Sequence, residues 1–266
     1  MYTSFVLPTM EYGNVVWGGT FDTDLIKLEK IHVDGMRLVT GATARSNIAN
    51  LYTETCWKSL NERWETASLI MMFKMKNKMC PEYLTNLLPP ENNETIGYNL
   101  RNNQNIVIPA ARLESLKRSF IHQAINLWNK LPLELRQVPN LEEFRFLLKE
   151  KHKDCNILYY YGKRWPSLHH SRIRIGCSKL KSDLCFNLHV IEDPLCYCGE
   201  IEDAHHYFLH CPNYLDIRIN LFSFISAYAP VSLDIILYGK NELSLELNKL
   251  IFDAVFEFIE KSHRFT

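Results

Sequence analysis

A cluster of metal-binding residue types near the C-terminal third constrains the fold more than any other feature of the chain. The segment CYCGEIEDAHHYFLHC contains Cys196, Cys198, His206 and Cys211, with seven residues between Cys198 and His206 and four between His206 and Cys211. Three thiolates and one imidazole form a donor set typical of tetrahedral structural zinc sites. The spacing therefore predicts a zinc knuckle with these four residues as ligands.

Such a site would stabilise the fold rather than perform chemistry. Four protein ligands leave no open coordination position for a water molecule, so the zinc could not activate a nucleophile. Gly199 follows the second cysteine directly and suits a tight turn around the metal. The alternative interpretation is a group of buried free thiols in a reduced core.

The sequence leaves the choice of imidazole open among three histidines. His206 has the usual knuckle interval before Cys211, His205 is the fallback, and His210 is adjacent to Cys211 and would strain the loop. Cys177 or Cys185 is a minor candidate for a substitute ligand. Tyr207 and Phe208 are expected to pack beneath the metal as a small core.

Composition and charge limit the remaining possibilities. The chain has 266 residues, which suggests one or two domains, and its 30 basic and 30 acidic side chains exclude bulk attraction to polyanions. Eight cysteines spread over this length do not suggest a disulfide framework. Met1 is followed by no basic n-region, and no apolar run reaches roughly 18 residues. We expect an intracellular protein, in the nucleus or cytoplasm, with no membrane partner.

The apolar periodicity predicts a mainly α-helical chain. Helices are expected at 22–41, 56–78, 119–131 and 141–150, with the first two forming a hairpin. Residues 89–105 are rich in Asn and Pro and are typical of a linker. A C-terminal helix should place Leu243, Leu247, Leu250, Ala254 and Phe258 on one face that docks on the domain.

Basic residues are concentrated just before the knuckle. Between 149 and 181 they are Lys149, Lys151, Lys153, Lys163, Arg164, Arg172, Arg174, Lys179 and Lys181, opposed only by Glu150 and Asp154. The knuckle and its flank instead carry only acidic charges: Glu192, Asp193, Glu200, Glu202 and Asp203. A phosphate backbone would be repelled at the knuckle and attracted to the basic segment.

A nucleic-acid contact is therefore predicted for this segment. Its expected binding residues are Lys163, Arg164, Trp165, Arg172, Arg174, Lys179 and Lys181, with Tyr159, Tyr160 and Tyr161 also available for stacking on bases. The alternative is a solvated basic face whose aromatic side chains turn into the core.

Several motifs resemble one family, in the same order as in that family. YTSFVLPTMEYGNVVW, LIKLEKIHVDGMRLVTGAT, SLNERWETASLIMMFKMKN and CPEYL are similar to the region downstream of the palm in reverse transcriptases of non-LTR (LINE-type) retrotransposons. YNLRN, SFIHQAINLWNKLP, LEEFRFLLKE, RIRIGCSKL, the knuckle CYCGEIEDAHHYFLHCPNY and an arginine such as Arg218 continue the resemblance.

This resemblance implies a division into three segments. A thumb-like helical region would occupy 1–88, a linker and connector helices 89–150, and a basic segment, zinc knuckle and C-terminal helices 151–266. It also implies that the knuckle helps to hold RNA or DNA, either the element transcript or the target site, and that Cys196, Cys198, His206 and Cys211 are the metal ligands. No small-molecule substrate is expected.

The residues needed for polymerisation are missing from the sequence. Phosphoryl transfer by a polymerase needs paired aspartates that hold two metal ions, and the chain has no Tyr-x-Asp-Asp motif. Asp22 and Asp24 lie at a predicted helix start, where capping explains them. Asp234 and Lys240 lack the second carboxylate and close-set lysine of a metal-dependent nuclease.

Two hypotheses follow. The first is a noncatalytic, nucleic-acid-binding fragment of a retrotransposon reverse transcriptase with a structural zinc knuckle. The second is a helical protein-interaction module in which zinc serves only to fix the shape. A zinc enzyme is disfavoured because a fourth protein ligand leaves no exchangeable water on the metal.

Overall fold

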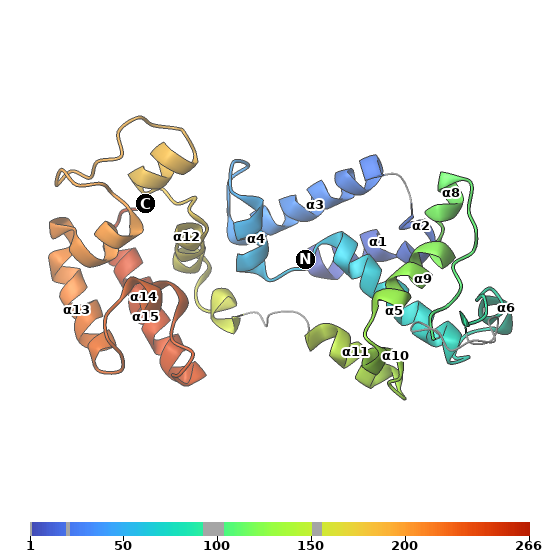
Figure 1. The fold of residues 1–266 in the computed structure, drawn as a ribbon. Coiled ribbons are helices and arrows are strands. Elements are labelled where there is room, and N and C mark those ends of the chain that lie inside the picture. The colour runs from blue at the N-terminus through green and yellow to red at the C-terminus, as the bar shows by residue number, and fades with distance from the viewer. Residues whose placement is uncertain (1, 20–21, 93–103, 151–155) are drawn as a thin grey trace. The chain divides into compact units, whose positions relative to one another are not determined.

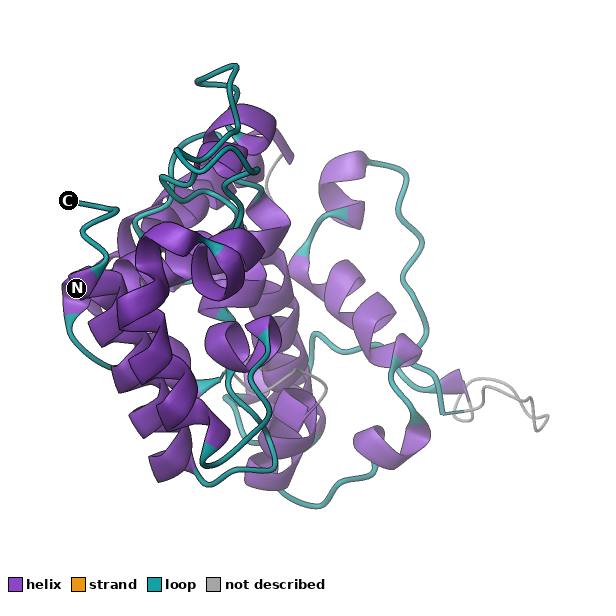
Figure 2. Cartoon of the chain, turned by 90° about the vertical axis from the view of Figure 1, so that its left-hand side faces the viewer, coloured by secondary structure: helices purple, strands orange, loops and turns teal. Residues whose placement is uncertain are grey.

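The computed structural model describes residues 2–19, 22–92, 104–150 and 156–266. The fold is mainly helical, as predicted, with 64% helix. Within these ranges no strand occurs, and Figure 2 shows helices joined by loops throughout. The motif YNLRN and the basic residues Lys151 and Lys153 lie outside the described residues. No helix among the described residues is long and apolar enough to cross a membrane.

The chain forms two compact units, and both are discontinuous in sequence. Unit 1 comprises residues 1–32 and 58–153, and unit 2 comprises 33–57 and 154–266. Residues 33–57 thus belong with the C-terminal half, whereas the three predicted segments assigned them to the N-terminal region. The boundary between the two units falls within helix α3 (Asp22–Thr40; Figure 1), between His32 and Val33.

Unit 1 is built around one long helix. Its elements are η1 (Tyr2–Val6), α1 (Leu7–Glu11), α2 (Asn14–Trp17), α5 (Leu60–Lys76), α6 (Glu82–Thr85), α8 (Glu114–Lys117), α9 (Phe120–Lys130), α10 (Leu133–Arg136) and α11 (Leu141–Glu150). Ser59 and Glu62 form a capping box that begins α5. Phe73 of α5 stacks on Phe144 of α11 at 4.6 Å between ring centroids, and Trp128 of α9 completes this cluster.

The predicted helices 119–131 and 141–150 are confirmed as α9 and α11. The predicted helix 56–78 is shorter, because Cys56 has a left-handed backbone and Ser59 is the N-cap of α5. A helix that was not predicted, α4 (Ile48–Thr55), lies between α3 and α5, so these two helices do not form a simple hairpin.

Unit 2 holds the predicted knuckle. After the end of α3 and α4, its elements are η2 (Ile157–Tyr160), α12 (Arg164–Ile175), η3 (Asp183–Asn187), η4 (His206–His210), η5 (Pro212–Tyr214), α13 (Leu215–Ser226), α14 (Leu233–Tyr238) and α15 (Leu245–Lys261). The core of unit 2 joins α12, α13 and α15, with Tyr207 and Phe208 fully buried inside it. The two aromatic residues therefore belong to the main core of the unit and not to a separate small core.

The C-terminal helix docks on its own unit, as expected, and its buried face coincides in part with the predicted stripe: Phe258 is in the core, and Leu243 and Ala254 pack against it. The buried side chains of α15 include Ile251, Phe252, Val255, Phe258 and Ile259. Of the predicted stripe, Phe258 is buried, but Leu250 is 46% exposed. Apolar residues occupy so many positions of this helix that periodicity alone could not select the buried face.

A buried ion pair joins α4 to α12. The Arg174 guanidinium donates to both carboxylate oxygens of Glu54, with a shortest N–O distance of 2.5 Å. Their side chains are 2% and 7% exposed. The Arg174 guanidinium also lies over the ring of Tyr159, with the Arg174 Cζ 4.4 Å from the ring centroid. The pair is removed from solvent and holds two sequence-distant segments together.

We expect Arg174→Met alone to lower the free energy of unfolding of unit 2 by about 3–5 kcal/mol, because it leaves a carboxylate buried without its cation. The double variant Glu54→Gln with Arg174→Met should recover part of this loss. Urea unfolding monitored by circular dichroism measures the effect. The control is Lys117→Gln, which breaks an exposed pair with Glu114 and should cost less than about 1 kcal/mol. Equal effects of the two variants would contradict this account.

Candidate metal centre

Cys196 and Cys198 lie on a tight backbone turn. The Cys196 N–H donates to the Glu200 carbonyl (2.7 Å), and the Gly199 N–H donates to the Cys196 carbonyl (2.9 Å). An antiparallel bridge between Leu195 and Ile201 closes the base of the turn. Gly199 has φ = +96°, a conformation that glycine adopts without strain, as its position in the sequence suggested.

His206 and Cys211 are held by the turn that follows. The Asp203 carboxylate accepts from the His206 N–H (2.7 Å) and so caps the start of η4. The Cys211 N–H donates to the His206 carbonyl (2.7 Å) at the other end of this turn. The two ligands contributed by this segment are therefore fixed relative to each other by main-chain hydrogen bonds.

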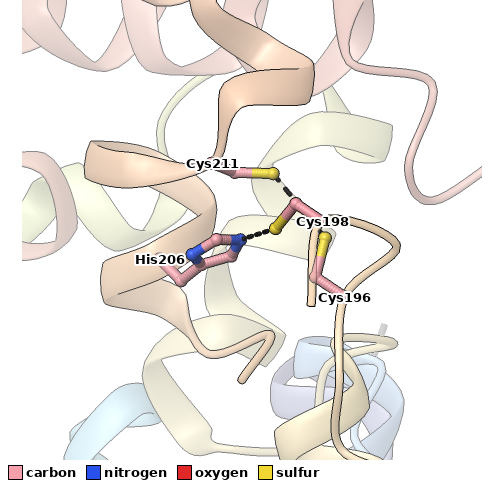
Figure 3. Close-up of side chains that lie close together, drawn as sticks. All are labelled: Cys196, Cys198, His206 and Cys211. Atoms are coloured by element: carbon pink, nitrogen blue, oxygen red, sulfur yellow. Dashed lines mark hydrogen bonds between the residues drawn. The ribbon is translucent and has the colours of Figure 1, made fainter. Parts of the chain in front are cut away.

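All four predicted ligands converge in the structure. One donor atom from each of Cys196, Cys198, His206 and Cys211 lies within 4.8 Å of every other. The Cys196 and Cys211 sulfurs are 3.6 Å apart, and the Cys198 sulfur is 3.1 Å from His206 Nε2. Figure 3 shows the imidazole and the three thiols facing a common centre from the two segments.

These spacings suit a tetrahedral metal ion. Metal–sulfur bonds of about 2.3 Å at a tetrahedral centre place two sulfurs roughly 3.8 Å apart, close to the separation of Cys196 and Cys211. This is the one group of at least three potential ligands found among the described residues. The four side chains lie close enough together to hold a metal ion.

The structure selects His206 among the three histidines. Its Nε2 faces the sulfurs, while its Nδ1 lies 3.0 Å from a carboxylate oxygen of Glu200. A carboxylate on the remote nitrogen fixes the orientation of the ring and makes Nε2 a better ligand. His205 and His210 are outside the ligand group, and their rings lie against each other with centroids 4.7 Å apart.

The substitute cysteines are also outside the group. Cys185 Sγ lies 3.3 Å from the Glu192 carbonyl oxygen, and Cys177 is a buried thiol in the small core beside α4. Burial is the main reason that the pKa of the Cys177 thiol is raised, which keeps it in the neutral form.

The ligand thiols do not share one environment. Burial, and then the neighbouring Cys196 sulfur, raise the pKa of Cys211 to about 12. A hydrogen bond from the Glu200 backbone is the main cause that lowers the pKa of Cys198. Collecting the thiolates in one place is therefore unfavourable unless a cation offsets their charge. A bound metal ion provides that compensation, since metal binding displaces the thiol protons.

Arg218 supports Cys211 in a way that spacing did not reveal. It is 4% exposed, and its guanidinium donates to the carbonyls of Cys211 (2.5 Å) and Phe208 (2.9 Å). Arg218 is part of the family resemblance in the sequence. Its hydrogen bonds to the Cys211 and Phe208 carbonyls, however, are visible only in the fold.

A second ion pair fixes the knuckle to the C-terminal tail. Glu202 is 3% exposed, and both of its carboxylate oxygens accept from Arg264 at 2.6 Å. The Lys181 backbone N–H also donates to Glu202 (3.0 Å). Glu202 was expected to add to the negative charge of the knuckle, yet its charge is balanced within the fold.

All three predicted nucleic-acid-binding arginines make internal contacts. Arg174 is buried in the pair with Glu54, so it is not available to a phosphate, and its assignment as a binding residue is corrected here. Arg172 donates to the Gly41 carbonyl (2.6 Å), and Arg164 donates to the carbonyls of Leu38 and Val39 (3.1 and 3.0 Å). The last two arginines satisfy carbonyls at and just beyond the C-terminal end of α3.

The other predicted residues are more accessible. Lys163, Arg164 and Lys179 are exposed, and Trp165 is 39% exposed. Lys179 nevertheless donates to the Phe265 carbonyl (3.0 Å), and Lys181 lies 3.7 Å from Asp193 and over the Tyr197 ring. Lys163, Arg164 and Trp165 are consecutive at the start of α12 and each is exposed, and we call these three residues the α12 entry.

The aspartates that resembled catalytic groups have local roles. Asp22 and Asp24 lie in the first turn of α3, where Asp22 pairs with Arg118 and Asp24 with Lys27. Lys240 pairs with Glu242 rather than with Asp234.

Comparison with known proteins gave no matching family model, no matching curated protein and no matching solved structure.

We expect Cys198→Ser to abolish stoichiometric metal binding and to unfold the segment 194–214 locally, because binding to such a site contributes folding free energy of about 10–16 kcal/mol. Elemental analysis after gel filtration measures the metal, and limited proteolysis measures the local unfolding. Cys185→Ser is the matched control, since it removes a nearby thiol outside the ligand group. Unchanged metal content in Cys198→Ser, or equal losses in both variants, would contradict the assignment.

Proposed function

We propose that the metal ion is zinc and that its role is structural. The donor set of three thiolates and one imidazole is the one that zinc prefers, and the sulfur spacing fits its bond length. When bound, zinc would supply a cation that joins the turn at 196–199 to η4 and Cys211. Four protein ligands leave no position for a reacting water, which argues against hydrolytic chemistry at this centre.

We further propose that the chain binds nucleic acid without catalysing a reaction on it. The motifs that resemble the post-palm region of non-LTR retrotransposon reverse transcriptases support this role, and the chain lacks the paired aspartates of the polymerase site. The partner would be RNA or DNA, either an element transcript or a target site, and the protein would act in the nucleus or cytoplasm.

The α12 entry is the observation that carries this proposal. Two exposed cations stand next to a partly exposed indole, in a stretch from 156 to 181 that contains no Asp or Glu. Cations beside aromatic rings bind single strands by contacting phosphates and stacking on bases. We propose Lys163, Arg164 and Trp165 as the main binding residues. Lys179 is also exposed, whereas Lys181 and Arg172 are only partly accessible.

The second candidate function, a protein-interaction module, is favoured by a different observation. Leu215 and Ile219 of α13 are 55% and 58% exposed and lie one helical turn apart. A pair of exposed apolar residues on one helix face can contact a protein partner. In this case zinc would only fix the shape of the unit.

Binding of fluorescein-labelled single-stranded RNA and DNA, measured by anisotropy at rising salt, tests the proposal. We expect the affinity to fall with salt, and Lys163→Gln to weaken binding several-fold and to reduce the logarithmic salt slope by about 0.7, the value for one lost phosphate contact. The matched control is Lys117→Gln, which removes one exposed lysine from unit 1. Absence of binding, or binding that does not respond to salt, would reject the nucleic-acid role and favour the protein-interaction module.

A further inference from the structure

A cavity of about 180 Å³ lies within unit 2 and is separate from the metal centre. It is lined by residues from the C-terminal ends of α3 and α4, from η2 and the residues after it, and from α12, and one side of it is open. Its volume exceeds the share of roughly 30 Å³ that one water molecule occupies in the liquid, but it is smaller than the ~300 Å³ at which drug-sized pockets begin. A single small ring is the kind of group that it can enclose.

Ser171 gives the cavity an unsatisfied polar group. Ser171 is among the residues that line the cavity, it is only 6% exposed, and its buried Oγ has no hydrogen-bond partner among the described residues. Buried hydroxyl groups are normally paired, so an unpaired one in a native fold needs an explanation. A ligand that hydrogen-bonds this hydroxyl is such an explanation.

Glu54 adds an acceptor to the same wall. Arg174 occupies one side of the carboxylate and fixes its orientation. Glu54 lines the cavity, and a carboxylate has about four lone-pair positions, so the ion pair with Arg174 does not use all of its acceptor capacity. The cavity therefore combines a hydroxyl, which donates or accepts, with a fixed and strong acceptor.

Aromatic rings and a cation complete the lining. Tyr159 and Tyr160 both line the cavity, and Tyr160 is 54% exposed, so part of its ring is accessible to a ligand at the opening. Arg164 also lines the cavity and belongs to the α12 entry, next to the exposed Lys163. The cations proposed to hold phosphates thus adjoin a small polar cavity with aromatic walls.

We propose that this cavity binds one unstacked nucleobase that carries an exocyclic amine. The amine would donate to Glu54, an acceptor or donor on the ring would pair with Ser171, and the ring would contact Tyr160. Glutamate accepts hydrogen bonds from the amino group of cytosine, and aromatic side chains stack on bases of any kind. The inference rests on the proposed function and deepens it, because it places the phosphate of the same nucleotide at Lys163 and Arg164. Uracil and thymine lack the amine and should bind more weakly.

The first test compares intact and abasic oligonucleotides by fluorescence anisotropy. A cytosine-rich single-stranded 12-mer should bind at least about fivefold more tightly than the same strand with its bases removed at alternate positions, although the two carry equal numbers of phosphates. A uracil 12-mer should fall between them. Equal affinity for intact and abasic strands would overturn the assignment of the cavity to a base.

Variants of the lining provide the second test. Ser171→Ala should weaken binding of the cytosine-rich strand about fivefold without lowering the melting temperature, because it removes an unpaired buried hydroxyl. Tyr160→Leu should weaken it by about tenfold, and Tyr160→Phe should keep the stacking surface and bind more tightly than Tyr160→Leu. Ser226→Ala, on α13 of the same unit, is the matched control. Affinities within twofold of the wild type for both Ser171→Ala and Tyr160→Leu would overturn the proposal.

A third measurement separates this inference from the proposed function. Cytidine 5′-monophosphate is added to the full chain, and its binding is followed by ligand-observed NMR. If oligonucleotides bind in a salt-dependent manner but neither base removal nor Ser171→Ala has an effect, the cavity assignment fails and the proposed function stands. If no oligonucleotide binds, the proposed function fails, and the result with cytidine 5′-monophosphate decides whether the cavity binds a nucleotide. Binding of the mononucleotide that Ser171→Ala weakens would support a site for a free nucleotide. Absence of binding would overturn the assignment of the cavity to a base.

Discussion

The convergence of three cysteines and one histidine is the constraint on which the organisation of unit 2 depends. The turn at 196–199 is closed by few hydrogen bonds of its own, and η4 is a single helical turn. Neither segment has enough length to be stable alone. A metal ion held by ligands from both would join them, and Tyr207 and Phe208 extend this connection into the core between α13 and α15. Metal coordination would thus stabilise the same short segment that hydrophobic burial holds in the core.

Around this centre, the charged side chains mostly satisfy the fold. Glu200 orients His206, Glu202 pairs with Arg264, and Arg218 binds the carbonyls beside Cys211. Arg174 is used in the same way with Glu54. The basic residues of one segment of the sequence therefore do not all lie on the surface. Among the described basic residues of this segment, Lys149, Lys163, Arg164 and Lys179 are exposed. The proposed nucleic-acid contact is correspondingly local, at the start of α12.

The sequence predicted the helical class, α9, α11 and the ligand group, because each depends on local spacing that periodicity and ligand intervals record. Spacing favoured His206 over His205 as the ligand, and the fold adds the contact of His206 with Glu200, which spacing does not record. The pairs Glu54–Arg174 and Glu202–Arg264 could not be foreseen, because they join residues 120 and 62 positions apart. The cavity at Ser171 was missed for the same reason: its walls come from segments that only the fold brings together.

X-ray absorption at the zinc K-edge of the metal-loaded protein tests the central claim most directly, because it reports the atoms bound to the metal. We expect the zinc ion to be bound by three sulfurs at about 2.3 Å and one nitrogen at about 2.0 Å, with no water oxygen. A shell of four sulfurs, or one that contains oxygen in place of a sulfur, would contradict the assignment of Cys196, Cys198, His206 and Cys211.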